Sequence, residues 1–128
     1  MKRSFLIVFL IITSSVVCFS YDYWFKDVSV RGNTQRAYFF KDLNAFETAS
    51  GFRTPLFDWW ETNENANASY RDIFGTMRRE GFVAAFVLAE YSTLLTPNTP
   101  YKYQFYYIVN GRTYVAVKEL SRRINMDN

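Results

Sequence analysis

Alternating apolar and polar positions near the C-terminus predict a β-hairpin. The segments 101–109 and 112–120 are rich in aromatic and β-branched residues, and they flank Asn110-Gly111. That pair suits a two-residue type I′ turn, because both of its positions need a positive φ. The turn fixes the register of the two strands, so that Tyr107 lies opposite Tyr114.

A helix is predicted upstream, at about 70–80. Ser69 and Asp72 resemble a capping box, and the apolar positions that follow recur at helical spacing. Gly81 is a natural stop, because it can adopt the left-handed conformation that ends many helices.

The apolar run 82–91 has no clear period and fits either a buried strand or a continuing helix. Its valines and aromatics, and the glycine before it, favour a strand. With the hairpin, this strand would form a three-strand antiparallel meander.

The N-terminal half gives weaker signals. A strand is predicted at 22–30 and a helix at about 35–49, with a hairpin turning at Gly32-Asn33 as the competing interpretation of the same residues. Thr54-Pro55 is a good helix start, with a cap followed by proline, so a short helix is expected through Trp60.

These elements together predict an α+β fold. Its antiparallel sheet, with a C-terminal three-strand meander at about 82–91, 101–109 and 112–120, would pack against one or two helices at about 35–49 and 70–80.

The first 20 residues have the pattern of an export signal. Lys2 and Arg3 form a short positive segment, 5–12 is an unbroken apolar run, and 13–20 consists of small and moderately apolar residues. This order is typical of a cleaved signal peptide that ends at Ser20. A retained membrane anchor is disfavoured, because a spanning helix needs about 20 mostly apolar residues. Lipidation at Cys18 is the minority alternative, since Val17 stands where a small residue is usual.

Cleavage would leave a single small domain at 21–128 with no cysteine, and therefore no disulfide. Small secreted domains often depend on disulfides. The absence of disulfides therefore favours a location in a bacterial periplasm or on a cell surface. Loss of Lys2 and Arg3 lowers the basic count from 15 to 13 against 12 acidic residues. A nearly neutral chain has no electrostatic footprint for nucleic acid. After cleavage the protein is not expected to be integral to a membrane.

The chain contains no histidine. This excludes histidine-activated nucleophiles and histidine metal sites, and the loss of Cys18 removes thiolate ligands as well. No metal or other cofactor is predicted. Carboxylates remain as the acid/base groups, and Asp58, Glu61 and Glu64 lie near a tryptophan pair. Glu90 is notable because it lies in an apolar run.

Aromatic residues make up 20% of the chain and suggest a contact surface. Adjacent residues on a helix point about 100° apart, so Trp59 and Trp60 would not both fill one core stripe. The predicted binding residues are Trp59, Trp60, Phe57, Tyr103 and Tyr107. Burial of the tryptophan pair and of the hairpin tyrosines in the core is the alternative. Tyr23-Trp24-Phe25 is a further aromatic group.

The sequence therefore predicts a small exported binding protein without enzymatic activity, which contacts a protein, a glycan or an envelope component through aromatic residues. Two alternatives remain open. One is a carboxylate-dependent glycan hydrolase. The other is a structural subunit that assembles through an edge strand.

We expect the exported protein to begin near Tyr21 and to dissolve without detergent. N-terminal sequencing and intact mass of material recovered after export test this expectation. A chain that still starts at Met1, or one that carries lipid on Cys18, would contradict it.

Overall fold

The structure is a computed structural model that describes residues 22–92, 94 and 98–126. The predicted signal at 1–20 and the expected first mature residue, Tyr21, lie outside the described residues.

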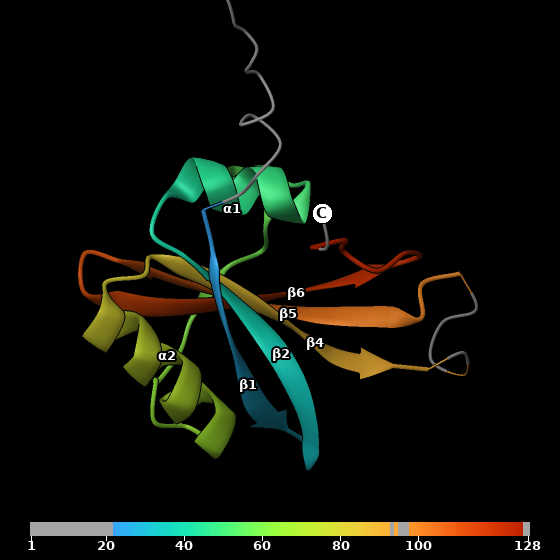
Figure 1. Ribbon diagram of the computed structural model, residues 1–128, viewed down its shortest axis with the longest axis horizontal. Helices are drawn as coiled ribbons and strands as arrows, with labels where there is room; N and C mark the ends of the chain where they lie inside the picture. Colours follow the sequence, from blue (N-terminus) through green and yellow to red (C-terminus); the bar gives the residue numbers. More distant parts are fainter. Residues whose placement is uncertain (1–21, 93, 95–97, 127–128) are drawn as a thin grey trace, which may run out of the picture.

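The described part of the chain forms one antiparallel sheet of six strands, in the order β1-β2-β4-β5-β6-β3. Helix α1 lies over one face of this sheet and α2 over the other (Figure 1). The predicted antiparallel α+β fold is confirmed. The strands are β1 (Trp24–Val30), β2 (Asn33–Phe40), β3 (Trp60–Glu61), β4 (Ala84–Tyr91), β5 (Tyr101–Val109) and β6 (Arg112–Leu120), and the helices are α1 (Leu43–Ser50) and α2 (Ala68–Glu80).

The C-terminal meander β4-β5-β6 has the predicted strands and register. Asn110 and Gly111 form the turn with φ values of 53° and 76°. Tyr107 pairs with Tyr114 as predicted. The run at 82–91 is strand β4, which pairs with β5. The β5–β6 prediction needed only a local pattern, because the turn sets the pairing of its two strands.

Helix α2 is present where it was predicted, and it ends at Gly81 with a φ of 81°. The capping residue differs from the prediction. The side chain of Asn67, rather than Ser69, accepts the Tyr70 N–H at 2.9 Å. Asparagine and serine are both good caps, so sequence alone did not separate them.

The helix predicted at 35–49 is present only in its second half, as α1. Its first half is strand β2, and the competing hairpin is correct except that the turn lies one residue earlier, at Arg31-Gly32. Phe39 and Phe40 explain the outcome, because both side chains are fully buried. Neighbouring residues of a strand point to opposite faces, and each of these two packs on a different side of the covered sheet.

The short helix expected through Trp60 is wrong. A single 3₁₀ turn spans Thr54–Leu56, and the chain then extends until Trp60 and Glu61 pair with β6. The proline prediction of a helical start was therefore correct for one turn only.

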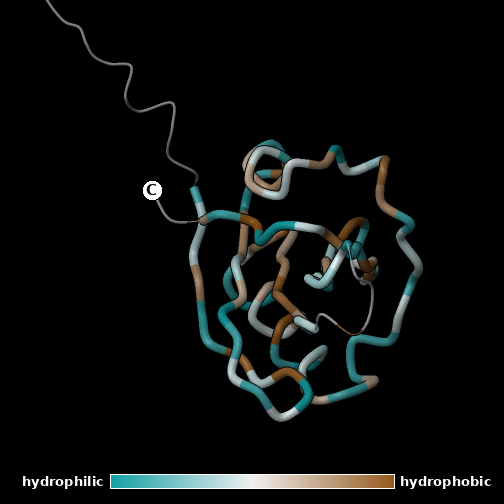
Figure 2. Tube along the Cα trace, turned by 90° about the vertical axis from the view of Figure 1, so that its right-hand side faces the viewer, coloured by the Kyte–Doolittle hydropathy of each residue, from teal (hydrophilic) through white to brown (hydrophobic). Residues whose placement is uncertain are grey.

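The core has two layers, one on each face of the sheet. On the α2 side, Ile73, Phe74 and Met77 pack on the sheet. On the α1 side, Phe46 and Phe57 do so. Figure 2 shows many of the most polar residues on the outer turns of the chain.

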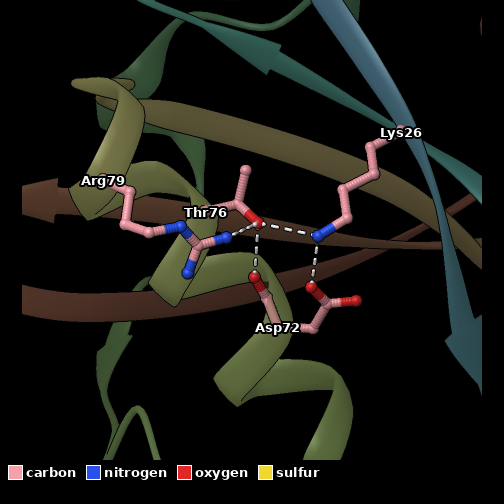
Figure 3. A network of polar contacts seen from close by, with 4 residues as sticks. All are labelled: Lys26, Asp72, Thr76 and Arg79. Carbon is pink, nitrogen blue, oxygen red and sulfur yellow. Dashed lines mark hydrogen bonds and ion pairs between the residues drawn. The ribbon is translucent and has the colours of Figure 1, made fainter.

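A polar network ties α2 to the edge strand β1 (Figure 3). The Lys26 ammonium lies 2.6 Å from Asp72 Oδ1 and donates to Thr76 Oγ1 at 3.1 Å. Thr76 donates to the Asp72 carbonyl at 2.8 Å and accepts from Arg79 at 3.3 Å. Because the Thr76 side chain is buried, these bonds supply the partners that it needs.

No helix within residues 22–92, 94 and 98–126 has the length and apolar character needed to cross a membrane.

We expect Gly111→Val to lower the free energy of unfolding by more than about 1 kcal/mol, because a β-branched residue resists a positive φ. Urea melts of the two proteins measure the change. Asn110→Gly is the control, since glycine accepts the same conformation, and it should have a much smaller effect. Equal stability of the valine variant and the parent protein would contradict the turn assignment.

Candidate functional site

Trp59 and Trp60 lie on an extended segment, and they point to opposite faces of the sheet. Trp60 pairs with Val115, a residue of the α2-side core. Successive side chains of a strand alternate, so Trp59 lies on the α1 side. The two rings do diverge, as the sequence suggested, but strand alternation rather than helical geometry is the cause.

Trp59 is anchored to the core of the α1 side. Its ring centroid lies 4.9 Å from that of Phe57 and 5.3 Å from that of Tyr107. Its indole N–H donates to the Thr54 carbonyl at 3.0 Å. A tryptophan with both apolar and polar partners of this kind supports the loop that covers the sheet.

Two of the predicted contact residues are buried. Phe57 is 5% exposed and Tyr103 is 4% exposed. The Tyr103 hydroxyl accepts the Ile124 N–H at 2.9 Å, and burial raises its pKa. Tyr107 is half-buried against Trp59. Of the five predicted residues, Trp60 is the most exposed, with an exposed fraction of 48%.

The two glutamates near the tryptophan pair form ion pairs with different arginines. Glu64 lies 2.7 Å from Arg78, and Glu61 lies 3.5 Å from Arg112. Asp58 is exposed. Carboxylates held by separate surface cations are typical of solvated faces, and this arrangement does not bring them together as an acid/base pair.

Glu90 is also paired. Arg31 and Lys102 each lie 3.4 Å from its carboxylate. It lies near the end of β4, beside the place where the β4–β5 register shifts. Its position inside an apolar run is thus explained by two cations, one from the β1–β2 turn and one from β5.

The third tryptophan of the chain, Trp24, lies at the other edge of the sheet, where its ring lines a pocket. Its ring stacks on Phe82 with a centroid distance of 5.7 Å and an interplanar angle of 17°, and it is 46% exposed. Phe39 supports the same ring at 5.6 Å. We call this pocket of about 420 Å³ the Trp24 pocket, and it is lined by Asp22, Tyr23, Trp24, Lys41, Asp42, Glu80 and Phe82.

The polar residues of the Trp24 pocket come from several elements. Asp42 caps α1, and its Oδ1 accepts the Asn44 N–H at 3.3 Å. Glu80 is the last residue of α2. The Lys41 ammonium lies 5.5 Å from the centre of the Phe82 ring, within the range of a cation–π contact. The pocket therefore combines an aromatic wall with carboxylate acceptors and an ammonium donor.

From the sequence, Trp24 was noted only as part of the aromatic group Tyr23-Trp24-Phe25, and it was not among the predicted binding residues. Its exposure depends on β1 being the outermost strand, and on the last turn of α2 stopping beside it. Neither fact is contained in the local pattern. Within the described part of the chain, no cluster of three or more histidine, cysteine or acidic side chains could hold a metal ion.

Comparisons with protein-family models, with curated proteins and with solved structures found no match for this chain.

The two neighbouring tryptophans give a matched pair of variants. We expect Trp59→Ala to cost about 3 kcal/mol of unfolding free energy, because it removes a packed ring and a hydrogen bond. Trp60→Ala should cost less than about 1 kcal/mol, as is usual for a half-exposed edge residue. Urea melts followed by circular dichroism measure both. Equal losses in the two variants would contradict the different environments of the two rings.

Proposed function

We propose that this chain is a small exported binding protein without enzymatic activity, and that it contacts a glycan through the Trp24 pocket. Protein or other envelope components are the wider class of partner predicted from the sequence. The export signal read from the first 20 residues supports action in the periplasm or outside the cell.

The observation that carries this proposal is the half-exposed Trp24 ring, held rigid over a concave surface. Phe82 and Phe39 pack against it, so little conformational entropy remains to be lost when a ligand binds. Tryptophan offers a flat apolar surface and is enriched where binding energy is concentrated. One face of a sugar ring presents C–H groups that match such a surface.

The polar residues around the ring support a ligand that is rich in hydroxyl groups. Carboxylates accept hydrogen bonds from hydroxyls, and an ammonium donates to them. Asp42, Glu80 and Lys41 supply both kinds of group around one aromatic wall. Ligand pockets generally have this composition, with a few placed polar groups on an apolar surface.

A second function, assembly through an edge strand, is favoured by β1. This strand of seven residues is the last in the sheet, and its outer side pairs with no other strand among the described residues. Exposed edges accept strands from other chains. Trp24 and Phe25 on β1 are each 46% exposed and would add apolar area to such a contact.

Titration of the purified protein with neutral oligosaccharides, followed by calorimetry, tests the glycan proposal. Trp24→Ala should weaken binding about 30-fold, the loss typical of a hot-spot tryptophan. Trp60→Ala is the matched control, because that ring is equally exposed at the opposite edge of the sheet, and it should bind normally. Glu80→Gln keeps the shape of the pocket and should weaken binding to a smaller extent.

Other outcomes are equally informative. Loss of binding in Trp60→Ala alone would move the contact surface to the one predicted from the sequence. Release of shorter sugars during the titration would favour the hydrolase alternative. Absence of glycan binding together with concentration-dependent dimers, measured by sedimentation, would favour assembly through β1. A circular dichroism spectrum for each variant verifies that it is folded.

A further inference from the structure

A groove lies at the opposite end of α2 from the Trp24 pocket. Its volume is about 670 Å³. It is bounded by residues 67–70 at the start of α2, by Arg31-Gly32 of the β1–β2 turn and by the N-terminal half of β5. Figure 1 shows the tip of the β1–β2 hairpin beside the N-terminal end of α2. We call it the α2 groove. Its apolar surface includes Val30, Ala89 and Val117.

The Tyr106 hydroxyl reaches the α2 groove without a partner. The side chain is only 1% exposed, and its ring packs edge-on against Tyr70 and Phe74. In residues 22–92, 94 and 98–126 no hydrogen bond involves this hydroxyl. The hydroxyl oxygen also keeps some solvent-exposed area. Among the described residues, the one side-chain polar atom that is both fully buried and without a hydrogen bond is Thr54 Oγ1. Because buried hydroxyls are nearly always hydrogen-bonded, this one is available to a ligand or to water.

The Tyr106 hydroxyl is a hydrogen-bond donor at neutral pH. Burial raises its pKa, and the neighbouring Tyr70 raises it further. The group therefore keeps its proton, and an acceptor atom in the groove is the partner that suits it.

Helix α2 adds donors at the same place. The Asn67 side chain accepts the Tyr70 N–H, and the first N–H of α2 with a backbone acceptor in the helix is that of Arg71. The N–H groups of Ala68 and Ser69 therefore have no acceptor within the helix. The N-terminal end of a helix carries a partial positive charge, which favours an anion. Together with the tyrosine, these groups make one wall of the groove a donor surface.

The charged residues that line the α2 groove are Arg31, Lys102 and Asp72. Arg31 and Lys102 share the Glu90 carboxylate at 3.4 Å each. Asp72 is bound by Lys26 at 2.6 Å. Glu119 lies opposite Lys102 on β6, so three cations face three carboxylates around the groove. A ligand with a single negative charge therefore disturbs this balance less than a more highly charged one.

We propose that the α2 groove binds a small carboxylic acid with an apolar body. The carboxylate accepts from Tyr106 and from the first turn of α2, and the apolar body lies along Val30, Ala89 and Val117. A phosphate dianion fits less well, because it would bring excess negative charge close to Asp72 and Glu90. The inference rests on a different end of the molecule from the glycan proposal and does not depend on it.

Titration of the purified protein with hexanoate, followed by NMR or calorimetry, tests the site. Binding in the millimolar range or tighter is expected for an acid of this size. Tyr106→Phe should weaken it about tenfold or more, because it removes a hydrogen bond to a charged group. The adjacent Tyr107→Phe is the matched control on the opposite face of β5 and should bind normally. Lys102→Gln should also weaken binding.

Stability measurements keep the result interpretable. Tyr106→Phe should leave the urea midpoint unchanged, because the hydroxyl has no partner in the folded chain. A large loss of stability in that variant would overturn the proposal, since it would show that the hydroxyl has a structural role. Trp24→Ala should leave hexanoate binding intact, which separates this site from the glycan pocket.

Three ligand results would also overturn the proposal. These are no binding of hexanoate, equal binding by Tyr106→Phe and the parent protein, and binding of hexan-1-ol as strong as that of hexanoate. The last would show that the groove recognises apolar chains only. Preference for inorganic phosphate over hexanoate would overturn the assignment of a carboxylate.

Discussion

The burial of strand β4 on both of its faces is the constraint on which the rest of the structure depends. Residues 84–88 are all buried, because α1 covers one face of the sheet and α2 covers the other. Such a strand carries no polar alternation, and its neighbours must also place large side chains on both faces. This requirement explains why Phe39 and Phe40 follow each other on β2, and why the two aromatic layers of the core meet at the central strands.

The length of α2 relative to the sheet determines where a ligand can reach the α2 side. Its 13 residues extend about 20 Å, whereas the nine residues of β5 extend about 30 Å. The helix therefore covers the middle of the face and leaves both of its ends open. The Trp24 pocket adjoins Glu80 at one end, and the α2 groove adjoins residues 67–70 at the other. The network around Lys26 attaches the helix to β1 between the two.

Less of the candidate site than of the fold was predictable from the sequence. The aromatic residues were correctly singled out as the unusual feature, but their exposure was decided by distant partners. Phe57 and Tyr103 are buried by α1 and by the C-terminal segment, while Trp24 is exposed because β1 is an edge strand. Tyr106 gave no local signal at all. Its ring packs against Tyr70 in the first turn of α2, and no spacing along the chain encodes that contact.

The sequence by itself determined the elements whose signals are local. Asn110-Gly111 fixed the β5–β6 register, and Gly81 ended α2, because a positive φ at one or two residues specifies the geometry. The tertiary structure decided the strand at 33–40, which has the apolar spacing of a helix but pairs with β1 and β4. It also decided which aromatic rings face solvent. Both outcomes depend on contacts between residues far apart in the chain, and burial against such neighbours outweighs a local preference of less than about 1 kcal/mol per residue.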